Sequence, residues 1–165
     1  MLSEPVFTGT LQVAVVVRDL DAAVRRHADD YGIGPWEIYE FNPSTVQDMV
    51  RDGEPAEYAM RIALTMVGNL QWELIQPLDD RSIYADFLRE HGEGLHHLGV
   101  AVKDYGETLE LMRGKGHTIL QGGLYNRVEF AYLSTERDLG FITEIFDFPA
   151  GLKQEPDAVY PPTSA

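Results

Sequence analysis

The chain has 165 residues, of which 44% are hydrophobic, so it has room for one packed core or two small fused modules. Its 27 Asp and Glu residues against 13 Lys and Arg give a formal charge of −14, which repels phosphate backbones and argues against a nucleic-acid partner. The chain contains no cysteine, so disulfides and thiolate sites are excluded, and a metal would be bound by oxygen and imidazole nitrogen.

The first ten residues have neither the basic start nor the apolar run of a secretory signal peptide. No stretch of the sequence reaches the roughly 20 apolar residues that a membrane-spanning helix needs. We therefore expect a cytoplasmic protein that does not associate with a membrane.

The first half of the chain reads as a strand, a helix and further strands. Leu11–Val17 is a short apolar run typical of a strand, and Asp19 is placed to cap a helix that follows it. The polar stretch 42–57, which contains two prolines and a glycine, is predicted to be a long loop. Further strands are predicted at Arg61–Val67 and Gln71–Gln76.

The second half of the chain repeats this order after a linking helix, which Ser82 is placed to cap. A strand begins at His96, and Asp104 has the capping-box spacing that starts another helix. Strands are then predicted at Arg127–Leu133 and Phe141–Phe146. The residues after Pro149 are rich in proline and polar side chains, so we expect a tail that is extended over the surface or disordered.

The sequence also contains a weak internal repeat. LQVAVVVRDL, which starts at Leu11, is similar to HHLGVAVKDY, which starts at His96, and this aligns Gln12 with His97. QWELIQ is similar to ITEIFD, and this aligns Glu73 with Glu144. A repeat of this kind indicates two similar modules packed together, here with helices and strands in both.

Gln12, Glu73, His97 and Glu144 each lie on an otherwise small or apolar face of a predicted strand. Burying even a neutral polar group costs about 2–7 kcal/mol, and a carboxylate costs more unless something offsets its desolvation. Each residue taken singly is better explained as a solvated or structural side chain. Their paired positions in the repeat favour a shared metal site, in which two carboxylates would balance the charge of a divalent cation.

The run ELIQPLDDRSIYADFLREHGEGLHHLGVAV, residues 73–102, resembles the central segment of methylmalonyl-CoA epimerases and related glyoxalase-like proteins, most specifically in ELIQPL and GEGLHH. The resemblance extends over residues 11–148, and on it the chain is identified as a member of the vicinal oxygen chelate superfamily (glyoxalase/bleomycin resistance/dioxygenase). It implies an α+β fold of two tandem βαβββ modules whose curved sheets enclose a metal site. The implied organisation is an N-terminal extension (1–10), a first module (11–80), a linking helix (81–95), a second module (96–148) and a C-terminal tail (149–165).

Carried over residue by residue, the resemblance implies that Gln12, Glu73, His97 and Glu144 bind a divalent metal ion. The mixed oxygen and nitrogen donors suit Zn, Ni, Co, Mn or Fe and do not choose among them. Epimerases of the family usually have His at the position of Gln12, whereas the animal type of glyoxalase I has Gln there with Glu, His and Glu at the other three. Gln is a weaker ligand than His, so the donor set leaves the reaction type open.

The leading hypothesis is a metal-dependent isomerase or epimerase that transfers a proton next to a carbonyl group. Glu144 is the first candidate for the base and Glu73 the second. The small-molecule substrate would be an acyl-CoA, as in the epimerases, or a bulky apolar ketone such as a ketosteroid. The aromatic side chains are expected mainly in the core, with some lining a pocket: Trp36, Tyr39, Phe41, Trp72, Tyr125, Phe130 and Tyr132.

Two alternatives stay open, a glyoxalase I-type lyase and a non-catalytic binding protein of the bleomycin-resistance type. A ring-cleaving dioxygenase is disfavoured because its site usually uses two His and one Glu, whereas the four candidate ligands here include only one His. His96 is expected to face away from His97, in a structural or ligand-supporting role. Family analogy also implies a homodimer.

Overall fold

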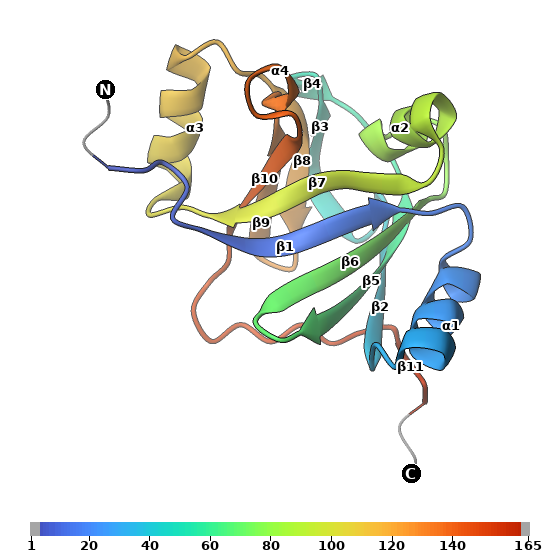
Figure 1. Ribbon diagram of the computed structural model, residues 1–165. Coiled ribbons are helices and arrows are strands. Elements are labelled where there is room, and N and C mark those ends of the chain that lie inside the picture. Colours follow the sequence, from blue (N-terminus) through green and yellow to red (C-terminus); the bar gives the residue numbers. More distant parts are fainter. Residues whose placement is uncertain (1–3, 163–165) are drawn as a thin grey trace.

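One curled sheet dominates residues 4–162, the part of the chain that the computed structural model describes (Figure 1). Its strand order is β11-β2-β5-β6-β1-β7-β10-β9-β8-β3-β4. The bounds are β1 Gly9–Val16, β2 Trp36–Phe41, β3 Val46–Arg51, β4 Glu54–Pro55, β5 Met60–Val67, β6 Leu70–Pro77, β7 Gly94–Ala101, β8 Ile119–Tyr125, β9 Val128–Leu133, β10 Ile142–Asp147 and β11 Ala158–Tyr160. A curled mixed sheet with few helices confirms the predicted fold class.

Three of the helices begin where the sequence predicts a capping residue. They are α1 (Leu20–Tyr31), α2 (Ile83–His91) and α3 (Tyr105–Gly114), and a short α4 (Glu136–Leu139) follows. In each of the three, the capping side chain accepts a hydrogen bond from a backbone N–H of the first turn, which satisfies a donor that the helix itself leaves unpaired. The pairs are Asp19 with Ala22 at 2.9 Å, Ser82 with Ala85 at 3.2 Å and Asp104 with Glu107 at 2.7 Å.

The central strands β1 and β7 pair antiparallel in a register that reflects the repeat. Gln12 lies opposite Gly99, and Ala14 lies opposite His97. The repeat aligns Gln12 with His97 and Ala14 with Gly99, each 85 positions further along the chain. Replacing each residue by its repeat equivalent therefore turns one of the two pairs into the other. A local twofold axis therefore passes between β1 and β7.

The outer neighbours of these strands obey the same symmetry. β6 runs parallel to β1 with Glu73 opposite Ala14, and β10 runs parallel to β7 with Glu144 opposite Gly99. The two glutamates thus occupy equivalent places on either side of the axis. The repeat read from the sequence is confirmed by the strand pairing.

Two layers of apolar side chains cover the sheet. On the outside, α1 packs Leu20 and Val24 against the first half, and α3 packs Leu109 and Met112 against the second. The inside of the curl holds a separate cluster that draws on both halves, including Ala14, Tyr39, Met60, Ile62, Phe130 and Tyr132. The concave face is therefore where residues from both modules meet.

The prediction that residues 42–57 form a long loop is wrong. This segment forms β3 and β4, and β3 pairs with β8 at the far edge of the second module. Val46 and Met49 are buried although a bulge breaks the strand between Gln47 and Val50, and Asp48 has a φ of 50°. The bulge disrupts the alternation of buried and exposed positions, so the sequence pattern lacks the signature of a strand.

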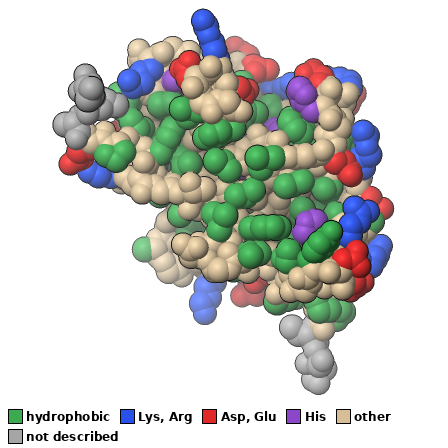
Figure 2. All heavy atoms as spheres, viewed as in Figure 1, with side chains coloured by type: hydrophobic (Ala, Val, Ile, Leu, Met, Phe, Trp, Pro, Cys, Tyr) green, Lys and Arg blue, Asp and Glu red, His purple; other side chains and the backbone are tan. Residues whose placement is uncertain are grey.

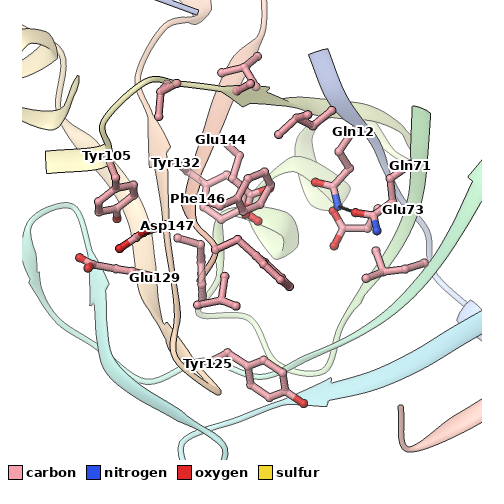
Figure 3. A pocket seen from close by; sticks show the side chains of 18 of the residues that line it. Gln12, Gln71, Glu73, Tyr105, Tyr125, Glu129, Tyr132, Glu144, Phe146 and Asp147 are labelled. Carbon is pink, nitrogen blue, oxygen red and sulfur yellow. Dashed lines mark hydrogen bonds between the residues drawn. The ribbon is translucent and has the colours of Figure 1, made fainter. Parts of the chain in front are cut away.

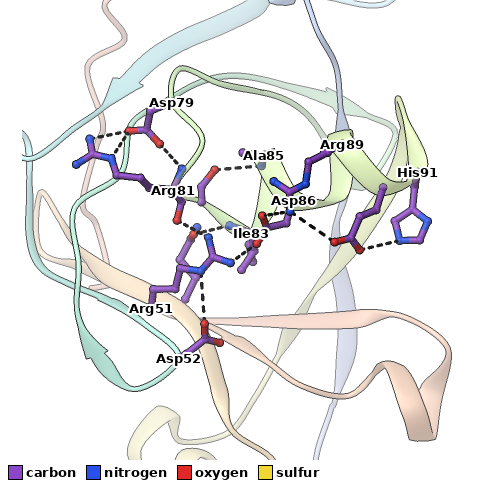
Figure 4. Close-up of polar contacts among 12 residues, drawn as sticks. Arg51, Asp52, Asp79, Arg81, Ile83, Ala85, Asp86, Arg89 and His91 are labelled. Atoms are coloured by element: carbon purple, nitrogen blue, oxygen red, sulfur yellow. Dashed lines mark hydrogen bonds and ion pairs between the residues drawn. The ribbon is translucent and has the colours of Figure 1, made fainter.

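Polar contacts fix this inserted hairpin to α2 (Figure 4). The guanidinium of Arg51 contacts both the carbonyl oxygen of Arg81 and the carboxylate of Asp86. Arg89 Nη2 lies 2.5 Å from the other oxygen of Asp86. Burial alone would raise the pKa of Asp86, but the two guanidinium groups outweigh it and lower that pKa. The hairpin therefore has a defined place beside the linking helix.

The C-terminal segment runs from the second module back to the first (Figure 1). Asn126 donates a hydrogen bond to Gln154 at 2.8 Å, and the backbone N–H of Glu40 donates to Asp157 at 2.8 Å. β11 then pairs with β2 at the opposite edge of the sheet. The tail is extended over the surface through residue 162, and residues 163–165 lie outside the described part.

None of the helices within residues 4–162 is long and apolar enough to cross a membrane.

Candidate metal centre

Four central strands each direct one predicted metal donor toward the concave face of the sheet. Gln12 lies on β1, Glu73 on β6, His97 on β7 and Glu144 on β10. Their side chains are buried, with 4%, 5%, 0% and 4% of the residue surface exposed. One donor atom from each of Glu73, His97 and Glu144 lies within 4.8 Å of the others. Figure 3 shows Gln12 beside Glu73 on the same wall.

The imidazole of His97 stands between the two carboxylates. Its Nε2 lies 2.9 Å from Oε2 of Glu144 and 3.4 Å from Oε2 of Glu73. Burial alone would lower the pKa of His97, but the two carboxylates raise it to about 9. Burial raises the pKa of Glu73, and the charge of Glu144 adds to that effect against the opposing pull of His97. The charges of Glu73, His97 and Glu144 thus lie close together at a buried point, where water does not screen them.

The donor atoms of this group are also those that the protein leaves without hydrogen bonds. Among the described residues, six buried side-chain atoms have no hydrogen-bond partner, and four of them are Gln12 Oε1, Glu73 Oε2, His97 Nε2 and Glu144 Oε2. Three of these four atoms, His97 Nε2, Glu73 Oε2 and Glu144 Oε2, lie in the ion pairs described above, and Gln12 Oε1 is in none of them. A buried polar group without a good hydrogen bond costs about 1–3 kcal/mol, so a cation bound at this point would stabilise the group. Three oxygens and one imidazole nitrogen, with two negative charges, fit a divalent cation.

A hydrogen bond on the first module orients the amide of Gln12. Gln12 Nε2 donates to Gln71 Oε1 at 2.9 Å, so the amide oxygen points to the side where the carboxylates lie. Gly99 makes room for this side chain, since a Cβ there would lie 2.8 Å from the Cβ of Gln12. Neither Gln71 nor Gly99 is among the site residues predicted from the sequence. The position of Gln71, two residues before Glu73 on the same strand face, was the available signal.

In the second module, the ring of His96 contacts the ring of its neighbour His97. Strand alternation alone predicts that the two rings face apart. Their Nδ1 atoms lie 2.9 Å apart, and the His96 ring packs against Tyr84 and Phe87. The pairing of β1 with β7 skips His96, because Ala14 lies opposite His97 and Val15 opposite Leu95. This irregularity of the register turns the ring of His96 toward its neighbour. Burial, together with the charge of His97, lowers the pKa of His96 to about 2, so His96 is neutral.

A cavity of about 940 Å³ opens onto this group (Figure 3). Gln12, Glu73 and Glu144 lie in its wall. Phe41 of the first module stacks on Tyr125 of the second with ring centroids 4.0 Å apart, so the wall is continuous between the halves. The cavity is also lined by aromatic rings from both modules, namely Tyr39, Phe41, Tyr105, Tyr125, Phe130, Tyr132, Phe146 and Phe148. A concave chamber lined by aromatic rings, into which polar groups converge, is the usual form of a small-molecule site.

Comparison with known proteins identifies the family of the chain. A family model described as the Glyoxalase/Bleomycin resistance protein/Dioxygenase superfamily matches residues 11–132. No curated protein sequence matches the chain.

Several solved structures share the fold. Methylmalonyl-CoA epimerase from Mycobacterium tuberculosis is 24% identical, with 90% of this chain and 94% of that chain covered and a TM-score of 0.65. A variant of the Streptomyces coelicolor methylmalonyl-CoA epimerase in complex with 2-nitronate-propionyl-CoA is 20% identical, with 90% and 99% covered and a TM-score of 0.67. A hypothetical protein from Bacillus halodurans is 19% identical, with 88% and 97% covered and a TM-score of 0.66.

Proposed function

Because the chain belongs to the glyoxalase/bleomycin resistance protein/dioxygenase superfamily, we propose that it is a metal-dependent isomerase or epimerase that moves a proton next to a substrate carbonyl. The observation that supports this most is the convergence of four buried donor side chains at one point, three of which line a cavity. The structural likeness to epimerases is consistent with the proposal and by itself speaks for the fold alone.

In this proposal Gln12, Glu73, His97 and Glu144 hold the divalent cation, which can be Zn, Ni, Co, Mn or Fe. A cation bound there would polarise a substrate carbonyl and make the adjacent C–H more acidic. Gln71 and His96 keep the Gln12 oxygen and the His97 Nε2 turned toward the site through the hydrogen bonds described above. The aromatic rings in the wall would hold the apolar part of the substrate.

We assign the base to Glu144, with Glu73 as the second candidate. Glu144 lies opposite Tyr132 in the pairing of β10 with β9, and Phe146 follows on the same strand face. All three residues line the cavity, so a substrate that rests against the two rings presents its C–H to the Glu144 carboxylate. The carboxylate takes the proton and returns it to the same carbon on the other face, or to a neighbouring carbon.

The proposal is tested by deuterium exchange in D₂O with metal-loaded protein and a panel of small ketones and acyl-CoAs. The native protein is expected to incorporate deuterium next to the carbonyl of its substrate. Glu144→Gln keeps an oxygen donor but removes the base, so exchange should fall about 100-fold or more at equal metal content. The control is Glu110→Gln, an exposed carboxylate on α3. Exchange at the native rate in Glu144→Gln contradicts the assignment of the base.

A glyoxalase I-type lyase is the second candidate, and the donor set Gln, Glu, His and Glu favours it. Conversion of methylglyoxal with glutathione, measured against the deuterium exchange, decides between the two. A non-catalytic binding protein is the third candidate, but a buried group of four metal-donor side chains has no evident role in it. A purified protein that binds no divalent metal would support this third candidate.

A homodimer is part of the proposal, as the family analogy implies. Figure 2 shows hydrophobic side chains gathered over the face that β1 and β7 present to the viewer. Leu11 on β1 and Leu95 on β7 are 46% and 57% exposed. Patches of this kind often mark protein interfaces.

A further inference from the structure

The entrance of the cavity is acidic on both sides. Glu37 of β2 lines it from the first module, and Glu129 of β9 and Asp147 of β10 line it from the second. All three are exposed, and we call them the mouth carboxylates. Figure 3 shows Glu129 and Asp147 next to each other beside Tyr105. In the metal-loaded protein a divalent cation would balance the charges of Glu73 and Glu144, so the mouth carboxylates are the negative charges that remain.

The mouth carboxylates have no cationic partners. None of them forms an ion pair with another residue in the part of the chain that the structure describes. Glu129 and Asp147 even lie directly opposite each other in the pairing of β9 with β10. Like charges in such positions repel, so this arrangement costs stability. The negative potential at the entrance is therefore not cancelled locally.

Lys103 is the one basic residue in the described lining of the cavity. Its ammonium group pairs with the carboxylate of Glu4, and its side chain is 65% exposed. Both groups of this pair are exposed, so Glu4 offsets only part of the ammonium charge, and a single lysine does not provide a clamp for several phosphate or carboxylate groups. An acyl-CoA carries several phosphate charges and a glutathione adduct carries carboxylates, so both would have to pass the acidic entrance with one exposed lysine as the counter-charge.

We infer that the substrate is an uncharged apolar carbonyl compound, and that the acidic mouth discriminates against acyl-CoA and glutathione-linked substrates. This inference rests on the proposed function and narrows it to one substrate class. The interior fits such a compound, because the chamber is lined by aromatic rings and its volume of about 940 Å³ is at the upper end for small-molecule sites. The net charge of the chain, −14, also repels anions and so favours an uncharged substrate.

The test compares the binding of a matched pair of ketones to Ni²⁺-loaded protein by equilibrium dialysis. The probes are 2-tetralone and a 2-tetralone that bears a ring carboxylate, with propionyl-CoA as an acyl-CoA probe. At roughly 10 mM salt, where charges are weakly screened, the neutral ketone should bind about 10-fold more tightly than either anion. For the matched ketones the ratio should approach one at roughly 1 M salt.

Two triple variants identify the charges responsible. Neutralising the mouth carboxylates (Glu37→Gln, Glu129→Gln and Asp147→Asn) should remove most of the preference at low salt. A matched control with the same change in net charge, at exposed sites on α1 and α3, should retain it (Asp29→Asn, Asp30→Asn and Glu110→Gln). Thermal unfolding of both variants checks that they fold.

Three results of the binding experiments would overturn the inference, and one result of the exchange experiment would do so as well. One is binding of an anion as tightly as the neutral ketone at low salt. Another is an equal loss of preference in the control variant, and the third is failure of the neutral ketone to bind. The ratio is measured without turnover, so it is independent of the proton-transfer proposal. Deuterium exchange into an acyl-CoA alone would refute this inference and leave the proposed function standing.

Discussion

The two modules present their candidate metal donors at symmetric places but orient them by different contacts. In the first module Gln71, on the neighbouring strand β6, accepts a hydrogen bond from the amide of Gln12. The position equivalent to Gln71 in the second module is Ile142, which has no polar group to serve the same purpose. The support of Gln12 is thus specific to the first half.

In the second module the support comes from the adjacent residue, since His96 contacts His97 at Nδ1. The equivalent of His96 in the first module is Leu11, an exposed apolar residue. If His97 Nε2 is the metal donor, its Nδ1 carries the proton and donates to Nδ1 of His96. The backbone symmetry therefore fixes where the donors lie, while non-symmetric neighbours fix which atom each donor presents. Because placement and orientation have separate causes, the donor residue of one module can be replaced without any movement of the strands.

The largest expected effect comes from removing the symmetry-related donors one at a time. His97→Ala should weaken Ni²⁺ or Zn²⁺ binding more than about 100-fold, since it removes the nitrogen donor that stands between both carboxylates. Gln12→Ala should weaken it only about 10-fold, because a neutral amide oxygen is the poorer ligand. Competition against a chelator measures both constants. Equal losses would show that the two modules contribute equally, and no loss in either would refute the metal site.

A smaller effect is expected from the neighbours that orient these donors. His96→Leu gives the second module the residue type of the first and should reduce metal affinity about 10- to 100-fold. His96→Asn offers an oxygen near the place of Nδ1 and should recover part of the loss. Gln71→Ile gives the first module the residue type of Ile142 and should cost less than His96→Leu. If Leu and Asn at position 96 behave alike, His96 acts through packing alone.

Much of the fold could be predicted from the sequence because the signals were local or repeated. Capping residues at Asp19, Ser82 and Asp104 marked three helix starts that the structure confirms. The alignment of Gln12 with His97 and of Glu73 with Glu144 predicted the symmetry that the register of β1, β6, β7 and β10 shows. The assignment of these four residues as ligands remains a prediction.

What the sequence did not reveal depends on irregular or distant pairing. β3 joins the edge of the other module through a bulged strand, so neither its pattern nor its neighbours in the chain indicated its place. His96 turns toward His97 because one residue is skipped in the register of β7, and strand alternation alone predicts the opposite. The acidic mouth combines β2, β9 and β10, which only the folded sheet brings around one cavity.

The smallest expected effect concerns the stability of the metal-free protein. Burial raises the pKa of Glu73 above its ordinary value of 4.5, so ionised Glu73 destabilises the fold as the pH rises above that value. The raised pKa of His97, about 9 against 6.5, contributes stability that is complete below pH 6.5 and lost as the pH rises through 9. The stability of the metal-free protein therefore falls as the pH rises, above 4.5 through Glu73 and between 6.5 and about 9 through His97.

Glu73→Gln removes the destabilisation that comes from the ionised, buried carboxylate of Glu73. In metal-free protein at pH 7.5 it should raise stability by on the order of 1 kcal/mol, or about 2–4 °C in the melting temperature. In metal-loaded protein the sign should reverse, because the variant loses a ligand and with it the stabilisation that bound metal gives to the folded state. Glu110→Gln, an exposed carboxylate whose pairing with Arg113 contributes little, should change neither value appreciably. Melting curves with and without Ni²⁺ measure the sign. A lower melting temperature for metal-free Glu73→Gln would mean that its contact with His97 outweighs the cost of its burial.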